Sequence, residues 1–132
     1  MSKTTFVITD DAIFMRTLLR KIVEQEESYE VLGEASNGRE AIEAAEKYKP
    51  DILTLDITMP EMDGIQAVPE ILKVSPTTNI IMVSAMGQQS MVIEAIKQGA
   101  KDFVVKPFDK SRVFQSIKNV LAMNDQENGN QE

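Results

Sequence analysis

The sequence predicts an α/β protein in which a parallel sheet is covered by helices on both faces. Two observations carry this prediction. Five short apolar segments, each too short to form a helix, recur along the 132 residues. Each of them is followed by a longer segment whose apolar residues recur at helical spacing. Regular alternation of this kind is typical of a parallel sheet that buries both of its faces against helices.

The third predicted strand is the clearest of the five. Its apolar run lies between Pro50 and Pro60 and ends in Asp56. A carboxylate is costly to bury there unless a cation or hydrogen bonds compensate its charge. The five predicted strands cover residues 5–9, 29–35, 52–55, 79–83 and 103–105.

Capping residues indicate where four of the predicted helices begin or end. The first helix is predicted from residue 12 with Asp11 as its N-cap, and the second begins after the cap Asn37. The fourth helix, over residues 88–98, is expected to end at Gly99, and Asp109 is expected to cap the fifth.

The third helix contains a proline. Its apolar stripe starts after Gly64, and Pro69 lies inside it. A proline at such a position removes one backbone hydrogen bond and clashes with the preceding turn. We therefore expect this helix to be kinked or to begin only near Pro69.

Length and composition indicate one domain, predicted over residues 1–123, followed by a polar tail over residues 124–132 that we expect to be disordered. The net charge of −7 argues against a surface that binds nucleic acid. No apolar run is long enough to cross a membrane, and we expect a cytoplasmic location. The chain has neither cysteine nor histidine, which excludes thiol nucleophiles, histidine catalysis and Cys or His metal ligands.

Four of the five predicted strands end in side chains suited to metal or phosphate chemistry. Taken singly, each has a structural explanation, because an Asp before a helix is usually a cap. Ligands of open α/β sheets bind at the carboxyl ends of the strands, so these side chains are expected at one edge. They are Asp10 and Asp11 after the first strand, Asp56 after the third, Ser84 after the fourth and Lys106 after the fifth.

Crowded carboxylates raise one another's pKa unless a cation lies between them. Ligation by oxygen alone favours Mg²⁺, with Mn²⁺ as a substitute, over zinc. Lys106 would pair with a carboxylate before phosphorylation and with a phosphoryl oxygen after it. A carboxylate beside Mg²⁺, a lysine and a hydroxyl is suited to forming an aspartyl phosphate, with Asp56 as the nucleophile.

The motifs, in this order and spacing, resemble those of the response-regulator receiver domain over residues 3–122. Residues 84–92 are similar to the stand-alone chemotaxis regulators of the CheY type. The resemblance implies a flavodoxin-like (βα)5 fold with strand order 2-1-3-4-5. The matching motifs are Asp10-Asp11, Asp56 with Met59-Pro60-x-x-Asp63-Gly64, Ser84-Ala85 and Lys106-Pro107-Phe108.

The resemblance also implies a role for each site residue. Asp56 would accept the phosphoryl group, and Ser84 and Lys106 would contact its oxygens. The Lys106–Pro107 peptide bond is expected to be cis, as in relatives. The implied Mg²⁺ ligands are Asp11, Asp56 and the main-chain carbonyl of Thr58, with Asp10 acting mainly through water.

A switch is implied as well, because Phe103 matches the aromatic switch position of the family. We expect Ser84 to move onto the phosphoryl group and Phe103 to fill the space that it leaves. The fourth helix is more apolar than one buried stripe requires, which fits either a helix wedged into the core or a docking face. The predicted output face includes Met91, Ile93 and Val105.

The resemblance implies a signalling domain that acts as a monomer, rather than an enzyme. Its expected partners are a histidine kinase of the chemotaxis type as phosphodonor, the flagellar motor switch protein as output, and a phosphatase. A phosphorelay intermediate or a phosphate sink is the alternative within the family.

Two other classes fit the residues less well. A phosphatase of the haloacid-dehalogenase type needs a second acid two residues after its nucleophile, where this chain has Thr58. A flavodoxin-like cofactor binder needs a phosphate loop rich in Ser, Thr and Gly where this chain has Asp10 and Asp11.

Overall fold

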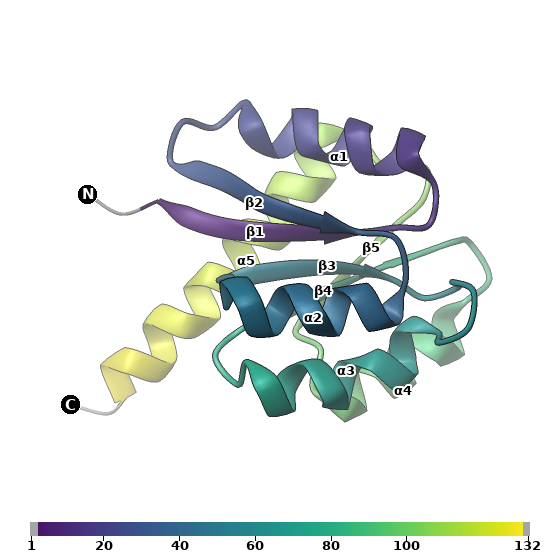
Figure 1. The fold of residues 1–132 in the computed structure, drawn as a ribbon. Helices are drawn as coiled ribbons and strands as arrows, with labels where there is room; N and C mark the ends of the chain where they lie inside the picture. The colour runs from purple at the N-terminus through teal and green to yellow at the C-terminus, as the bar shows by residue number, and fades with distance from the viewer. Residues whose placement is uncertain (1–2, 131–132) are drawn as a thin grey trace.

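Five parallel strands form the centre of the molecule, and helices cover both faces of the sheet (Figure 1). The computed structural model describes residues 3–130, with side chains described through residue 124. Within that part of the chain the strands are β1 (Thr4–Thr9), β2 (Tyr29–Ala35), β3 (Ile52–Asp56), β4 (Asn79–Ser84) and β5 (Asp102–Val105). The helices are α1 (Ile13–Glu24), α2 (Gly38–Tyr48), α3 (Gly64–Val74), α4 (Gln89–Gln98) and α5 (Lys110–Asn130).

The strand order is β2-β1-β3-β4-β5, and every neighbouring pair is parallel. This confirms the predicted fold class and the strand order that the resemblance implies. The predicted strand ends lie within one residue of the observed ones. β3 is the middle strand and every one of its residues is buried, which explains why its sequence is apolar on both sides of the pleat.

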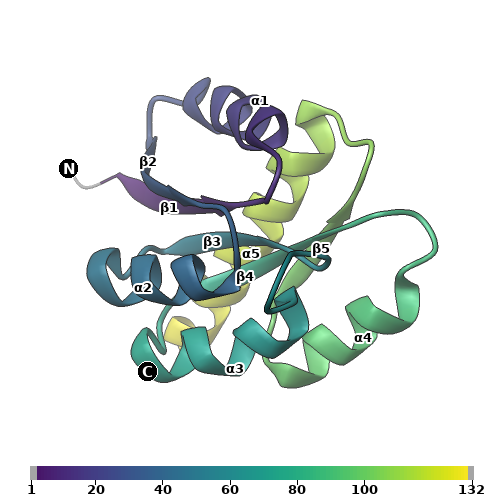
Figure 2. The same ribbon diagram turned by 45° about the vertical axis from the view of Figure 1, so that its right-hand side comes forward.

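The two faces of the sheet bury separate sets of apolar side chains. α1 and α5 cover one face, where Phe6, Ile8 and Ile117 lie in the core (Figure 2). α2, α3 and α4 cover the other face, which buries Leu53 and Leu55. Successive residues of a strand point to opposite faces, so strands covered on both sides need continuous apolar runs.

Two of the three predicted N-caps are present, and α4 ends at Gly99 as expected. The Asn37 side chain accepts a hydrogen bond from the backbone N–H of Glu40 at 2.8 Å. Asp109 accepts one from the backbone N–H of Arg112 at 3.0 Å. Each bond satisfies one of the N–H groups that the first turn of a helix leaves without a partner.

The prediction that Asp11 caps the first helix is wrong. α1 begins at Ile13, with Ala12 in the cap position and no side-chain cap. The backbone N–H of Ala12 instead donates to Asp10 Oδ1 at 2.9 Å, so the turn is closed one residue earlier than expected. Asp11 is thereby left exposed at the edge of the sheet.

α3 begins at Gly64 and continues past Pro69 to Val74. Its start is stabilised by a capping box, in which Asp63 and Gln66 each bond the other's backbone N–H. The prediction that this helix starts only near Pro69 is therefore wrong, because the capping box at Asp63, six residues before Pro69, stabilises the start of the helix there. A kink at Pro69 stays a prediction.

α5 continues to Asn130, so the backbone of residues 124–130 is helical where the sequence predicts a disordered tail. A helix that has already formed gains one hydrogen bond for each residue it adds, so it can extend into a polar segment. Residues 131–132 of the expected tail lie outside the described part, and the domain boundary at residue 123 stays a prediction. No helix among residues 3–130 is long and apolar enough to cross a membrane.

The loop after β3 returns closely onto the end of its own strand. The Gly64 N–H donates to the carbonyl of Ile57 at 2.7 Å and closes the loop. A Cβ atom at position 64 would overlap the carbonyl oxygen of Asp56, which is backbone and cannot turn away. Only glycine therefore allows this approach.

Replacing Gly64 with Ala should destabilise the protein by about 2 kcal/mol, because the loop must move away from β3 to admit the methyl group. Gly38, also the first residue of a helix, is the matched control. A Cβ there would lie 3.0 Å from Met62 atoms, so Gly38→Ala should cost less. Urea unfolding of both variants measures the difference, and equal losses would contradict the proposed overlap.

Candidate functional site

The register of the sheet brings the predicted site residues to one level. In the β1–β3 pairing the residues that precede Asp10 and Asp56 are partners, so the two acids follow side by side. In the β4–β5 pairing Ser84 is the partner of the residue that precedes Lys106. Four strand ends therefore meet at the carboxyl edge, as the sequence predicts.

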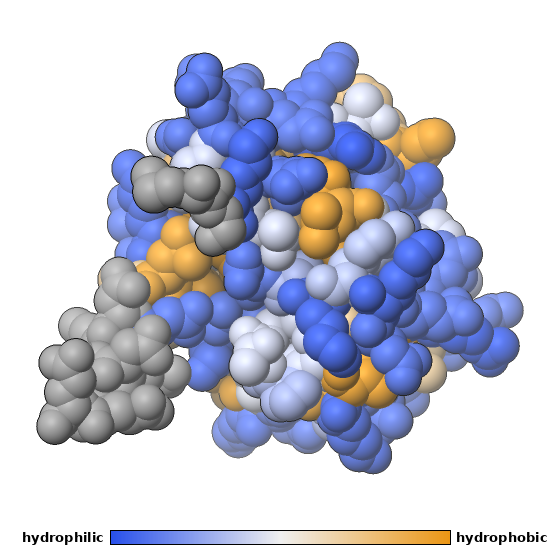
Figure 3. Space-filling view, turned by 60° about the vertical axis from the view of Figure 1, so that its left-hand side comes forward, coloured by the Kyte–Doolittle hydropathy of each residue, from blue (hydrophilic) through white to orange (hydrophobic). Residues whose placement is uncertain are grey.

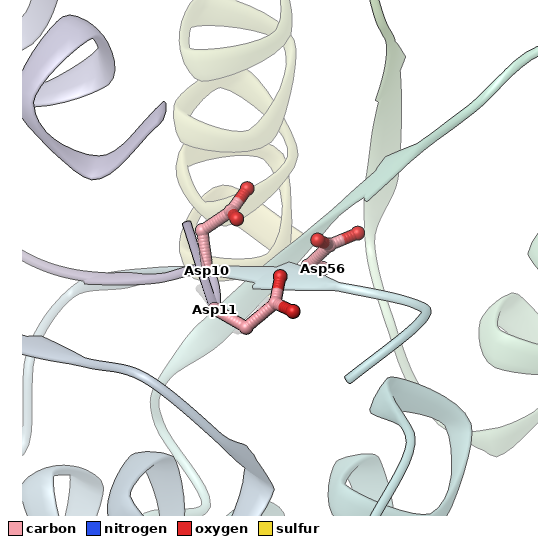
Figure 4. Close-up of side chains that lie close together, drawn as sticks. All are labelled: Asp10, Asp11 and Asp56. Carbon is pink, nitrogen blue, oxygen red and sulfur yellow. The ribbon is translucent and has the colours of Figure 1, made fainter. Parts of the chain in front are cut away.

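Three carboxylates converge at this edge (Figure 4). Asp10 and Asp11 come from the end of β1, and Asp56 from the end of β3. Each offers one carboxylate oxygen, and these oxygens lie within 4.8 Å of one another. Asp10 and Asp56 are buried, Asp56 being only 6% exposed, whereas Asp11 faces solvent. Negative charge is thus concentrated where water supplies little screening.

Lys106 reaches this cluster from the turn after β5. Its ammonium group donates to Asp10 Oδ2 at 2.9 Å and to Asp56 Oδ2 at 3.2 Å. Its backbone N–H donates to the Ser84 carbonyl at 2.7 Å, which fixes the turn against the end of β4. The Lys106–Pro107 peptide bond is cis, as expected. The predicted pairing of Lys106 with a carboxylate is present, and it involves two of the three acids.

Burial raises the pKa of Asp56, and the negative charge of Asp10 raises it further. Lys106 acts in the opposite direction without cancelling the shift. At Asp56 the neighbouring acids raise the pKa in the predicted direction, but burial is the larger cause because it removes water from the charged carboxylate.

Lys106 keeps its charge in this environment. Burial lowers its pKa, but the hydrogen bonds and negative charges of Asp10 and Asp56 together outweigh burial, so the pKa lies above the ordinary value for lysine. An ammonium group that stays protonated is a permanent positive charge beside Asp56. It is therefore placed to hold a negatively charged group that arrives there.

The donor set fits a hard divalent cation. The cluster contains carboxylate oxygens alone, which suits Mg²⁺ and excludes the sulfur and imidazole ligands that zinc prefers. Both oxygens of Asp10 already accept hydrogen bonds, one from Ala12 and one from Lys106. This leaves Asp11 and Asp56 as the acids best able to contact an ion directly.

Thr58, whose carbonyl is the expected third ligand, lies two residues beyond Asp56 in the loop after β3. Its side-chain hydroxyl accepts a hydrogen bond from Gln88 Nε2 at 2.9 Å. Gln88 Oε1 in turn accepts one from the backbone N–H of Ala85 at 2.7 Å. One side chain therefore connects the loop after β3 with the loop after β4, a contact that the sequence does not reveal.

The two predicted switch residues share a surface cavity next to the acids. Ser84 is buried at the end of β4, whereas Phe103 on β5 is 44% exposed. Both line a mainly apolar cavity of about 500 Å³, together with Val92, Ile93 and Val105. Phe103 is therefore partly turned to solvent in this structure and shares this cavity with Ser84.

α4 does not sit as a wedge in the core. Val92 and Ala95 are its buried residues, while Met91, Ile93 and Ile96 are exposed, Ile93 by 57%. By contrast, the face on the side of the strands' amino ends is mainly hydrophilic with separate apolar patches (Figure 3). The exposure of α4 favours the docking-face interpretation over the buried one.

The chain matches the model of the response regulator receiver domain over residues 6–118. It belongs to this family. The receiver domain is 60% identical to the chemotaxis protein CheY of Thermotoga maritima over 114 residues, covering 86% of this chain and 94% of that protein. It is 52% identical to CheY of Bacillus subtilis over 115 residues, covering 87% and 95%.

Among solved structures, the receiver domain resembles the crystal structure of the CheX–CheY–BeF3–Mg complex from Borrelia burgdorferi. The TM-score is 0.85 at 34% sequence identity, with 91% of this chain and 90% of that chain covered. Phosphorelay and Mg²⁺ binding are general properties of the family, and the three acids of this receiver domain form a pocket that fits the ion.

Replacing Asp56 with Asn should stabilise the receiver domain at pH 7 in the presence of a chelator. The folded state holds the pKa of Asp56 above its unfolded value, so ionisation opposes folding. Below the unfolded pKa of about 4 the carboxyl is protonated in both states and the cost is absent. Urea unfolding across this range should show an advantage of the variant that grows as pH rises. A stability difference that does not change with pH would contradict this prediction.

Proposed function

We propose that this receiver domain takes a phosphoryl group from a histidine kinase of the chemotaxis type on Asp56 and signals to the flagellar motor switch. The observation that carries the proposal is the buried carboxylate of Asp56 beside a charged Lys106 and two further acids. The high identity to CheY proteins supports the chemotaxis assignment. We further propose that the protein is cytoplasmic and monomeric, and that a phosphatase removes the phosphoryl group from Asp56.

In the proposed reaction an Asp56 oxygen attacks the phosphorus of a phosphohistidine. The new O–P bond forms as the N–P bond breaks, and the imidazole leaves with the electron pair and takes up a proton. Lys106 holds a phosphoryl oxygen in place of its bond to Asp56, and Asp10 remains its second partner. Ser84 donates a hydrogen bond from its hydroxyl to another phosphoryl oxygen.

The metal would be held by Asp11, Asp56 and the Thr58 carbonyl, with Asp10 contributing through water. When bound, Mg²⁺ offsets the negative charge shared by the acids and the phosphoryl oxygens. Mn²⁺ would substitute because it also takes oxygen ligands. The loop that carries Thr58 is closed tightly at Gly64, which supports a fixed place for its carbonyl.

The proposed switch uses the cavity that Ser84 and Phe103 both line. Phosphorylation adds three acceptor oxygens at the end of β3, and Ser84 is the hydroxyl at the neighbouring strand end. When Ser84 turns to them, Phe103 can move inward and change the shape of the surface with α4. Phe103 carries no hydroxyl, so its burial leaves no polar atom without a partner.

Incubation with acetyl phosphate and Mg²⁺ should add the mass of one phosphoryl group to the protein, and Asp56→Asn should abolish the adduct. Asp63→Asn is the matched control, because asparagine caps a helix as well as aspartate does. Intact-protein mass spectrometry measures both. An adduct on Asp56→Asn would contradict the assignment, and turnover of diverse phosphate esters would instead favour a phosphatase.

Ile93→Ser should weaken binding to a flagellar motor switch protein about tenfold, because a half-exposed apolar side chain at the centre of an interface contributes 1–2 kcal/mol. Phosphorylation of Asp56 should be unchanged. Pull-down with and without acetyl phosphate measures binding, and intact-protein mass spectrometry measures phosphorylation. If phosphorylation does not alter binding of the unsubstituted protein, a relay or phosphate sink is the better function.

A further inference from the structure

We propose that Arg16 is a positioning residue for the metal site, acting through the peptide bond between Asp10 and Asp11. Arg16 lies in the first half of α1, and its side chain is only 15% exposed. Its Nη1 donates to the main-chain carbonyl of Asp10 at 2.6 Å. This inference rests on the proposed function, because it concerns how the same acids are held.

The turn between β1 and α1 depends on few contacts. α1 has no side-chain cap, since Ala12 occupies the cap position. The Asp10 N–H donates to the Ala35 carbonyl at 3.1 Å, and Asp10 Oδ1 accepts from Ala12. These bonds fix Asp10 itself, and the bond from Arg16 is the contact that fixes the carbonyl between the two acids.

That carbonyl governs the placement of Asp11. It belongs to the Asp10–Asp11 peptide, whose six atoms lie in one plane, so its direction sets the start of the Asp11 residue. Within the described part of the chain no hydrogen bond holds the Asp11 carboxylate. Its position relative to Asp56 therefore depends on the backbone that Arg16 holds.

Glu34 at the end of β2 fixes Arg16 in turn. Arg16 Nε donates to Glu34 Oε1 at 3.0 Å, and Arg20 Nη1 donates to Glu34 Oε2 at 2.6 Å. The carboxylate thus binds one arginine with each oxygen. Through Arg16, Glu34 connects β2 and α1 to the acid cluster, although Glu34 itself offers no ligand there.

Two effects of removing Arg16 oppose each other. Losing a positive charge near the acids would tighten binding of a cation, but Glu34 already offsets much of that charge. Losing the hydrogen bond to the Asp10 carbonyl frees the peptide that carries Asp11. Groups that orient metal ligands contribute about 10–100-fold to metal affinity, so the loss of positioning should dominate.

The alternative is an ion pair that serves stability alone. The loss of such a pair would lower stability slightly without changing the affinity of a folded protein for Mg²⁺. Arg20 provides the comparison. It shares Glu34 with Arg16 and carries the same charge, but its described partners are Glu34 and Glu24, and the Asp10 carbonyl is not one of them.

Isothermal titration of the full chain with Mg²⁺ tests the proposal. Arg16→Met should weaken Mg²⁺ binding at least about tenfold, whereas Arg20→Met should change it by no more than about threefold. Arg16→Lys should restore part of the affinity, because an ammonium group can donate to the carbonyl but cannot form both bonds of the guanidinium. Circular dichroism verifies that the variants are folded.

Equal Mg²⁺ affinity of the unsubstituted protein and folded Arg16→Met would overturn the proposal and leave the proposed function intact. An equal loss in Arg16→Met and Arg20→Met would also overturn it, because the effect would then be one of charge. No Mg²⁺ binding by the unsubstituted protein would reject the metal site itself. If Arg16→Met does not fold, Glu34→Gln serves instead, with a smaller loss expected and an unchanged affinity as the contrary result.

Discussion

A carboxylate at the end of a fully buried strand is the constraint on which the site depends. Asp56 ends β3, where both faces of the sheet are covered, and burial opposes its ionisation. Asp10 adds to this cost, and Lys106, 50 residues further along the chain than Asp56, offsets part of it. Lys106 can do so because its backbone is bonded to the end of β4 and its turn is held there. The acid is thus kept next to a cation but short of full compensation, which is the state that a further cation or a phosphoryl oxygen would complete.

The same strand ends connect the acids with an apolar surface. β4 ends in Ser84 and β5 carries Phe103, and both line the cavity beside α4. On our proposal a phosphoryl group on Asp56 attracts the hydroxyl of Ser84, and the outward Phe103 gains room to move in. The phosphorylation site at the end of β3 and the apolar surface at β5 are then separated in the sheet only by β4. Such a short path needs no large rearrangement of the core, which stays packed on both faces of the sheet.

Much of the fold follows from the sequence because the relevant signals are local. Strand length, the caps Asn37 and Asp109, and the apolar stripes of the helices each depend on residues a few positions apart. The misses arise where two local signals compete. Asp10 closes the first turn in place of an Asp11 cap, and the capping box at Asp63 starts α3 although Pro69 lies inside it. Helical propagation through α5 past residue 123 is likewise a competition, in this case between a formed helix and a polar composition.

The sequence by itself determined the five strands, their order of appearance and the chemical types that stand at their ends. It identified Asp56 and Lys106 as a potential pair because both follow apolar strands, and parallel strands end at one edge. Only the tertiary structure decided which groups touch: that Lys106 binds Asp10 as well as Asp56, and that Arg16 holds the Asp10 carbonyl. The reason is physical. A hydrogen bond requires placement within a few tenths of an ångström, and that precision comes from sheet register and helix packing, which no local pattern of residues records.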